Sequence, residues 1–178
     1  MKSSQKRKIR RESEAQFYEP TKLALARLFK GKPCYLEITA THRQIGEIIK
    51  RVLTDYDLFA NVVERFIPDI TGYILNPDKS KAVIVVEVKP GPPRLKDVFQ
   101  AKEYAEIFGA KYALLISPRM VHEEVRRILR MKGEIVRHTA GRGRVMIGRL
   151  REANKEELVK SEKAGWVIDG WFPSKPMI

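Results

Sequence analysis

The chain has 178 residues, 43% of them apolar, which is enough to bury a hydrophobic core within one domain. Its formal net charge of +13 at pH 7 predicts a positive surface field, and such a field suits a polyanionic partner such as nucleic acid. The single cysteine, Cys34, excludes an internal disulfide framework and a cysteine-based metal site, and it favours a reducing, cytoplasmic setting. No run of about 18 apolar residues is present, so we expect no membrane span and no membrane partner.

The first 15 residues differ in composition from the rest of the chain. The stretch MKSSQKRKIRR carries six basic residues and no acidic one, which predicts a disordered arm over residues 1–15. Such an arm could act as a solubilising tail or contact phosphates, and the sequence leaves both open. Residues 16–178 contain no internal repeat and no low-complexity linker, so we expect them to form a single domain.

The expected secondary-structure elements alternate between helices and strands. In chain order, the pattern predicts a helix at 18–31, a strand at 34–39, a helix at 41–53, strands at 62–67, 69–75 and 81–89, a helix at 95–109, a strand at 111–117, a helix at 122–133, strands at 134–138 and 144–150, and a helix at 154–165. Adjacent strands followed by strand–helix–strand predict an α/β fold, with a central mixed sheet and helices on both faces.

Three local features accompany these elements. The helix at 41–53 has a basic face that we expect to be solvated, with DNA contact as the alternative. The closing helix begins with Asn154 and Glu157 at the spacing of a capping box. The tryptophans of the C-terminal tail, Trp166 and Trp171, are expected to serve core packing or dimerisation.

Charged residues end the otherwise apolar strand at 81–89. Because side chains alternate along a strand, Glu87 and Lys89 share one face where the strand emerges from the core. Asp69 follows Pro68 at the start of the preceding strand, so hairpin pairing would bring Asp69 close to Glu87. Two convergent carboxylates raise each other's pKa unless a cation is present. Mg²⁺ or Mn²⁺ would keep both ionised, whereas the competing interpretation is an ordinary buried ion pair between Glu87 and Lys89.

The pattern "PD" followed by "EVK" resembles the PD-(D/E)XK nuclease superfamily. The predicted order of elements matches its restriction-endonuclease-like core, which runs α-β-β-β-α-β. The resemblance covers residues 17–118 and leaves 119–178 as a C-terminal elaboration. It implies that Asp69, Glu87 and the carbonyl of Val88 bind the metal, and that Lys89 positions the attacking water. It also implies a catalytic, metal-binding glutamate on the first helix. Glu19 is the best match, and Glu12 and Glu14 lie nearby.

A second motif lies in the helix at 95–109. Gln100 and Tyr104 are four residues apart and share a helix face with Lys96. The stretch QAKEY resembles the Q-x-x-x-Y motif of RecB-like nucleases, which implies that these side chains help to place DNA near the metal. Lys96 and Arg94 are expected to contact phosphates. The alternative is that Tyr104 covers the sheet while Gln100 faces solvent.

These features predict a Mg²⁺- or Mn²⁺-dependent deoxyribonuclease that hydrolyses phosphodiester bonds in DNA repair, recombination or restriction. The expected partner is DNA, with a homodimer left open and no small-molecule cofactor beyond the metal. The alternatives are a non-catalytic nucleic-acid-binding protein on the same fold and an RNA nuclease. Within the superfamily, the motif favours a RecB-like enzyme acting on strand ends. The small basic chain favours a Holliday-junction-resolvase-like or restriction-type member.

Overall fold

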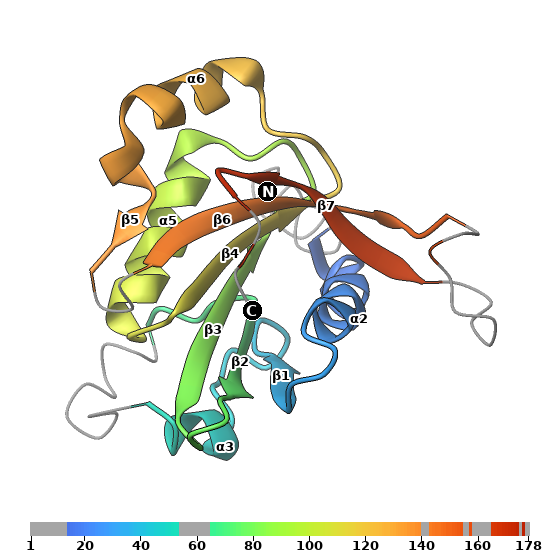
Figure 1. Ribbon diagram of the computed structural model, residues 1–178, viewed down its shortest axis with the longest axis vertical. Helices are drawn as coiled ribbons and strands as arrows, with labels where there is room; N and C mark the ends of the chain where they lie inside the picture. The colour runs from blue at the N-terminus through green and yellow to red at the C-terminus, as the bar shows by residue number, and fades with distance from the viewer. Residues whose placement is uncertain are drawn as a thin grey trace, which may run out of the picture.

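The computed structural model describes residues 14–53, 65–139, 143–154, 157, 165–174 and 176. The predicted α/β fold with a mixed sheet is confirmed, because seven strands form one sheet that packs against several helices (Figure 1). The elements in chain order are α2 (Tyr18–Leu28), β1 (Cys34–Ile38), α3 (Glu47–Lys50), β2 (Ile70–Leu75), β3 (Lys81–Val88), α5 (Leu95–Ile107), β4 (Tyr112–Ser117), α6 (Glu123–Met131), a 3₁₀ turn (Gly133–Ile135), β5 (Arg137–His138), β6 (Gly143–Glu152) and β7 (Trp166–Phe172).

The sheet combines an antiparallel half with a parallel centre. The strands lie in the order β1-β2-β3-β4-β6-β5, and β7 also pairs with β6. The β1–β2 and β2–β3 pairs are antiparallel, and β3–β4 and β4–β6 are parallel. Helix α5 connects β3 to β4, because parallel neighbours need a crossover. Strand β3 is therefore central, with an antiparallel neighbour on one side and a parallel neighbour on the other.

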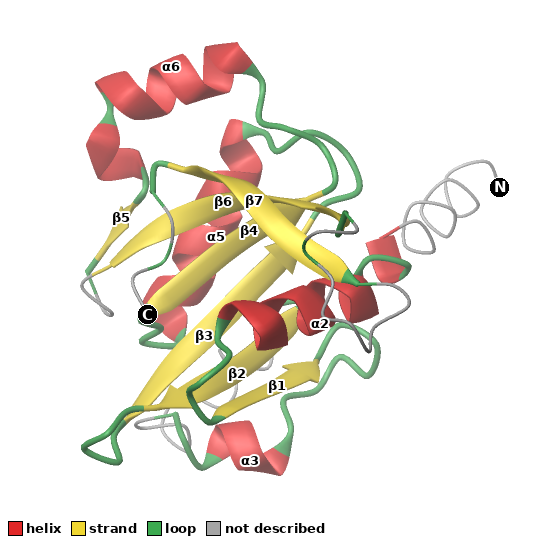
Figure 2. Ribbon diagram, turned by 45° about the vertical axis from the view of Figure 1, so that its right-hand side comes forward, coloured by secondary structure: helices red, strands yellow, loops and turns green. Residues whose placement is uncertain are grey.

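Two apolar clusters cover the two faces of the sheet. Val83 and Val85 of β3 pack with residues of α5, including Val98, on one face. Ile84 and Val86 of β3 pack with residues of α2 on the other face. Figure 2 shows α2 and α5 on opposite sides of the sheet. The alternation along β3 thus buries both faces of this strand, as its apolar sequence predicts.

The helix predicted over residues 41–53 is wrong for most of its length, because only Glu47–Lys50 is α-helical there. The Gly46 N–H donates to Glu37 Oε1 at 2.6 Å, and the Arg43 N–H donates to the Thr39 carbonyl at 2.9 Å. Contacts with the sheet therefore take precedence over helix propensity in this segment. Its apolar residues are still used, and Ile45, Ile49 and Leu53 are buried in the cluster on the α5 face.

Two predicted strands also differ from the structure. Of the strand at 62–67, residues 62–64 lie outside the described residues and 65–67 are not in a strand. Strand β1 instead supplies the outer strand beside β2. Of the strand at 134–138, residues 134 and 135 belong to the 3₁₀ turn Gly133–Ile135, and only Arg137 and His138 pair with β6.

The C-terminal tail forms a strand that the sequence did not indicate. Strand β7 pairs antiparallel with β6, and Trp166 and Trp171 pack against the cluster on the α2 face. The expectation of core packing is therefore confirmed for both tryptophans. Asn154 and Glu157 form the expected capping box, since each backbone N–H donates to the other's side chain, at 2.9 and 3.1 Å.

Two predicted segments fall on residues that the structure does not describe. The basic arm lies outside the described residues apart from its last two positions, and so does most of the helix predicted at 154–165. Among the helices of the described residues, none is long and apolar enough to cross a membrane.

Gly72 of β2 provides a test of the β1–β2 register. A Cβ added there would lie 2.2 Å from the Tyr35 carbonyl oxygen and 2.7 Å from Leu36 Cδ2. Because the nearest atom belongs to the backbone, Gly72→Ala should lower the free energy of unfolding by about 1–3 kcal/mol in denaturant titrations. Gly133→Ala is the control, since no atom lies within 4 Å of the added carbon. Equal stability of the two variants would contradict this packing.

Candidate functional site

Two carboxylates meet where the β2–β3 hairpin opens. Asp69 directly precedes β2, and its N–H donates to the Val86 carbonyl at 3.0 Å. Its carboxylate reaches across to β3, where Oδ2 accepts the Val88 N–H at 2.7 Å. Glu87 lies between these two contact points and is only 3% exposed. The antiparallel pairing of Ile70 with Val86 therefore brings both acidic residues to the same end of the hairpin.

Burial and mutual repulsion act on both carboxylates. Burial, followed by the negative charge of Asp69, raises the pKa of Glu87. Burial also raises the pKa of Asp69, although hydrogen bonds from Val88 and Tyr18 and the charge of Lys89 partly oppose the shift. Both groups are therefore harder to ionise than free carboxyls, which is the condition that a bound cation relieves.

Lys89 supplies the positive charge of this group. Its ammonium forms an ion pair with Glu87 Oε1 and lies 3.9 Å from Glu14 Oε1. The side chain is 14% exposed, so the pair is largely shielded from water. Burial works against the ammonium, but the charge and hydrogen bond of Glu87 and the charges of Glu14 and Asp69 together outweigh it, and the pKa of Lys89 is raised. Asp69, Glu87 and Lys89, expected from the sequence to act together, are thus neighbours in the structure.

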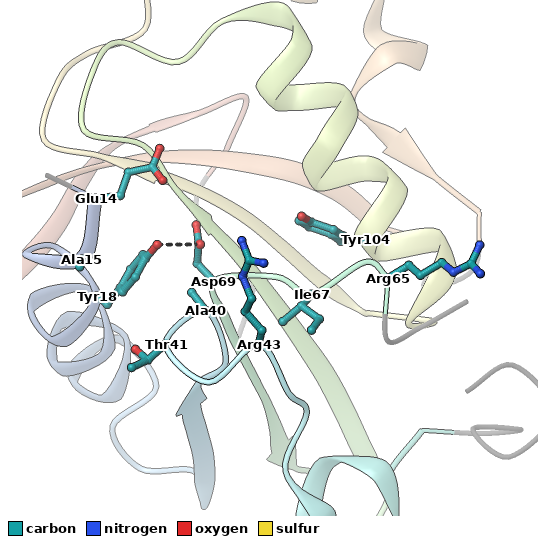
Figure 3. Close-up of a pocket in the computed structure, with 10 residues that line it drawn as sticks. All are labelled: Glu14, Ala15, Tyr18, Ala40, Thr41, Arg43, Arg65, Ile67, Asp69 and Tyr104. Carbon is teal, nitrogen blue, oxygen red and sulfur yellow. Dashed lines mark hydrogen bonds between the residues drawn. The ribbon is translucent and has the colours of Figure 1, made fainter. Parts of the chain in front are cut away.

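The N-terminal helical region contributes a tyrosine and a glutamate that the sequence reasoning did not select. The Tyr18 hydroxyl donates to Asp69 Oδ1 at 3.0 Å, and burial and the charge of Asp69 raise the pKa of Tyr18 (Figure 3). Glu14 precedes α2 and is separated from it by a turn at residues 16–17, and its side chain is 16% exposed and close to Lys89. Helical periodicity did not select Glu14, because the predicted helix begins at residue 18 and in the structure a turn at residues 16–17 separates Glu14 from α2.

The structure does not bring Glu19 into this group. Its side chain is 65% exposed and lies 3.9 Å from Lys22 Nζ. It lines a separate surface hollow together with Glu37 and Glu47. On a helix, Glu19 and Tyr18 point in different directions, because adjacent residues are about 100° apart. Glu14 is therefore the glutamate that the first helical region places beside the paired carboxylates.

Helix α5 brings Tyr104 to the site from the other side. Tyr104 is 8% exposed, and Gln100 Nε2 donates to its hydroxyl at 2.9 Å. Burial raises the pKa of Tyr104, and the charge of Glu87 adds to the shift. The Gln100–Tyr104 pair is therefore linked and directed at the acidic group, while Lys96 and Arg94 at the start of α5 are exposed.

A cleft of about 800 Å³ opens over this group. The residues that line it come from the N-terminal region, the loop after β1, the segment before β2 and α5: Glu14, Ala15, Tyr18, Ala40, Thr41, Arg43, Arg65, Ile67, Asp69 and Tyr104 (Figure 3). Carboxylates and tyrosine hydroxyls thus share the cleft with two arginine side chains. Arg43 and Arg65 were not selected from the sequence, and in the structure neither lies in a helix or strand.

The oxygen atoms that this group offers suit a hard divalent cation that is bound by only a few protein atoms. Within the described ranges, no three His, Cys, Asp or Glu side chains gather closely enough to hold a metal ion. Asp69 and Glu87 could supply two carboxylates and the end of β3 a carbonyl, with Val88 the residue expected from the sequence. Mg²⁺ is commonly bound in proteins by one or two carboxylates and retains several waters. The group therefore suits Mg²⁺ or Mn²⁺ better than a metal that requires a complete protein cage.

Comparisons of the chain with protein-family models, with curated proteins and with solved structures find no match. The functional conclusion therefore depends on the chemistry of the residues gathered at the cleft.

The raised pKa of Glu87 predicts how stability depends on pH without metal. Above the ordinary value of 4.5, the unfolded chain loses this proton while the folded chain keeps it. The free energy of unfolding should therefore fall as pH rises from 4.5 to the folded pKa. The loss is about 1.4 kcal/mol for each unit by which the pKa is raised. Denaturant titrations in EDTA at a series of pH values measure this slope.

Glu87→Gln should make the slope shallower, because an amide does not ionise in this range. Glu47→Gln is the matched control, since Glu47 is an exposed glutamate whose pKa is lowered by its hydrogen bond with Lys50. An unchanged slope in Glu87→Gln would show that Glu87 ionises normally in the folded chain.

Proposed function

We propose that this chain is a Mg²⁺- or Mn²⁺-dependent deoxyribonuclease with a restriction-endonuclease-like core. The observation that carries the proposal is the meeting of Asp69, Glu87 and Lys89 at the open end of the β2–β3 hairpin, beside a cleft. The order α2–β1–β2–β3–α5–β4, with α3 inserted after β1, supports the same core. The net charge of +13 supports a polyanionic substrate.

In this proposal each residue of the group has a defined task. Asp69 and Glu87 hold the divalent cation with the Val88 carbonyl, and Tyr18 and the Val88 N–H fix the carboxylate of Asp69. The cation, when bound, supplies Lewis-acid stabilisation of charge on the phosphoryl group and lowers the pKa of the attacking water. Lys89, held by its ion pair with Glu87, orients that water and offsets developing negative charge.

The surrounding side chains give the substrate its position. Tyr104 forms one wall of the cleft, and with Gln100, which donates a hydrogen bond to it, would hold the DNA backbone beside the carboxylates. Lys96 and Arg94 extend this wall as exposed cations that can reach phosphates further along the strand. Arg43 and Arg65 line the cleft as well, so positive charge faces a substrate from several elements.

One observation favours a non-catalytic nucleic-acid-binding protein instead. The described residues contain no cluster of three potential metal-ligating side chains, so the ion pair of Glu87 with Lys89 could be purely structural. That alternative predicts salt-sensitive binding of nucleic acid without cleavage and without specific uptake of metal.

Cleavage assays separate these two functions. The purified chain should cut at least one member of a panel of single strands, flaps, nicked duplexes and four-way junctions in Mg²⁺ or Mn²⁺. EDTA should abolish the reaction. Glu87→Gln and Asp69→Asn should each slow it by about 10³-fold, because a lost ligand removes several kcal/mol of charge stabilisation. RNA strands of the same sequences test the choice between the two polymers.

Asp78→Asn is the matched control for these variants. Asp78 is an acidic residue of the β2–β3 turn, at the opposite end of the hairpin from Asp69, and its change should leave the rate intact. Binding of the panel without cleavage of any member would favour the non-catalytic alternative.

Glu14 and Glu19 provide a second test, because they lie on the same N-terminal segment but only Glu14 faces the site. Glu14→Gln should weaken Mn²⁺ binding and slow cleavage by about 10-fold or more, the usual effect of removing a group that orients metal ligands. Glu19→Gln should change neither quantity. Calorimetric titration with Mn²⁺ and single-turnover cleavage measure both, and the reverse result would restore Glu19 as the helix glutamate.

A further inference from the structure

The loop between β1 and α3 is attached directly to the backbone of the candidate site. The N–H groups of Thr39 and Ala40 both donate to the Asp69 carbonyl, at 3.0 and 3.1 Å. The buried Thr39 hydroxyl donates to the Pro68 carbonyl at 2.6 Å. The start of this loop is therefore fixed relative to the residue whose carboxylate contacts the end of β3.

Arg43 occupies an unusual backbone conformation in this loop. Its φ angle is +51°, in the left-handed region that costs an L-residue free energy and that glycine adopts readily. The Arg43 N–H donates to the Thr39 carbonyl at 2.9 Å, which closes the turn and holds this conformation. A long charged side chain is thus kept at a position where glycine would be the less strained choice. Such outliers concentrate at binding sites.

The side chain of Arg43 is directed at the cleft. Arg43 is one of the residues that line it, and Figure 3 shows its side chain extending from the loop into the space beside Asp69. Arg43 is exposed, and among the residues that the structure describes its guanidinium forms no ion pair, so none of them competes with an anion for this side chain. A guanidinium offers planar paired donors that match the oxygens of a phosphate group.

We infer that Arg43 binds a backbone phosphate of the nucleic-acid strand that lies in the cleft. The inference rests on the proposed function and adds to it a substrate contact from the loop after β1. The anchoring of this loop to Asp69 fixes the contacted phosphate relative to the carboxylates, and so sets the register of the strand. The left-handed conformation of Arg43 is then the local cost of directing its guanidinium at this point.

The structure offers a matched control for this residue. Lys79 is the other described non-glycine residue with a positive φ, +65°, and it also carries a positive charge. It lies in the β2–β3 turn, at the far end of the hairpin from Asp69. Arg43→Gly and Lys79→Gly each remove one charge and one strained residue, so the two variants differ chiefly in whether the change lies at the cleft or far from it.

Binding of a labelled DNA duplex, measured by fluorescence anisotropy in Ca²⁺ over a series of salt concentrations, tests the inference. Arg43→Gly should weaken binding about 10-fold, as expected for a lost hydrogen bond to a charged group. It should also lower the slope of log affinity against log salt by about 0.9, the value for one phosphate contact. Lys79→Gly should retain the wild-type affinity and slope, and both variants should unfold within a few degrees of wild type.

Two further variants distinguish loss of the phosphate contact from a change in the conformation of the loop. Arg43→Asn keeps a side chain that tolerates the left-handed conformation and should lose the contact as Arg43→Gly does. Arg43→Lys keeps the charge and should recover the salt slope while losing part of the affinity, because an ammonium lacks the paired donors. Equal affinity and slope in Arg43→Gly and Lys79→Gly would overturn the inference.

This inference and the nuclease proposal can fail separately. If the wild-type chain binds DNA but cleaves no substrate in Mg²⁺ or Mn²⁺, catalysis is excluded, while the salt slope still decides the role of Arg43. If it cleaves DNA and Arg43→Gly matches Lys79→Gly in both binding and cleavage, the nuclease proposal stands and the contact is excluded. If wild type binds no nucleic acid, both are overturned.

Discussion

The candidate site depends on the buried carboxylates that meet at the open end of the β2–β3 hairpin. Asp69 and Glu87 meet there with Glu14 nearby, and Lys89 is the ammonium that faces them. Within the described residues, the two buried carboxylates share one direct ion-pair partner, Lys89, which leaves negative charge where burial disfavours it. Such a group can take up protons, or it can bind a cation and remain ionised. Binding of a cation is the option on which the proposed function rests, because a cation that keeps the carboxylates ionised also attracts a phosphate.

Asp69 connects this group to the rest of the fold. Its N–H contacts β3, its carbonyl holds the loop after β1, and its carboxylate accepts hydrogen bonds from Tyr18 and Val88. One residue therefore sets the relative positions of three parts of the cleft, and a functional site needs that kind of support. The acidic centre contrasts with the net charge of +13 of the chain as a whole. Under the proposed function, the net positive charge would attract a polyanion, and the acidic centre would retain a cation.

The fold follows from the sequence wherever hydrophobic patterning is strong and local. The apolar run of β3, the helical spacing of α5 and the turn between β2 and β3 each predicted the element that forms. Prediction failed where long-range contacts decide the conformation. Residues 41–53 have a helical apolar stripe, yet Glu37 and the sheet draw most of the segment into a loop. Strand β7 has little alternation of its own and forms because β6 offers an unpaired edge and α2 offers an apolar surface.

The sequence by itself determined which charged residues meet at the centre of the candidate site. A Pro–Asp pair before one strand, and a glutamate and a lysine at the end of the next, must approach each other once those strands form a hairpin, because pairing in a hairpin fixes which residues are opposite. Only the tertiary structure decided which further side chains join them. Glu14 rather than Glu19 faces the group because the direction of the first helical region depends on its packing against the sheet. Arg43 reaches the cleft because its loop is bonded to Asp69, a contact between residues far apart in the chain that no local pattern encodes.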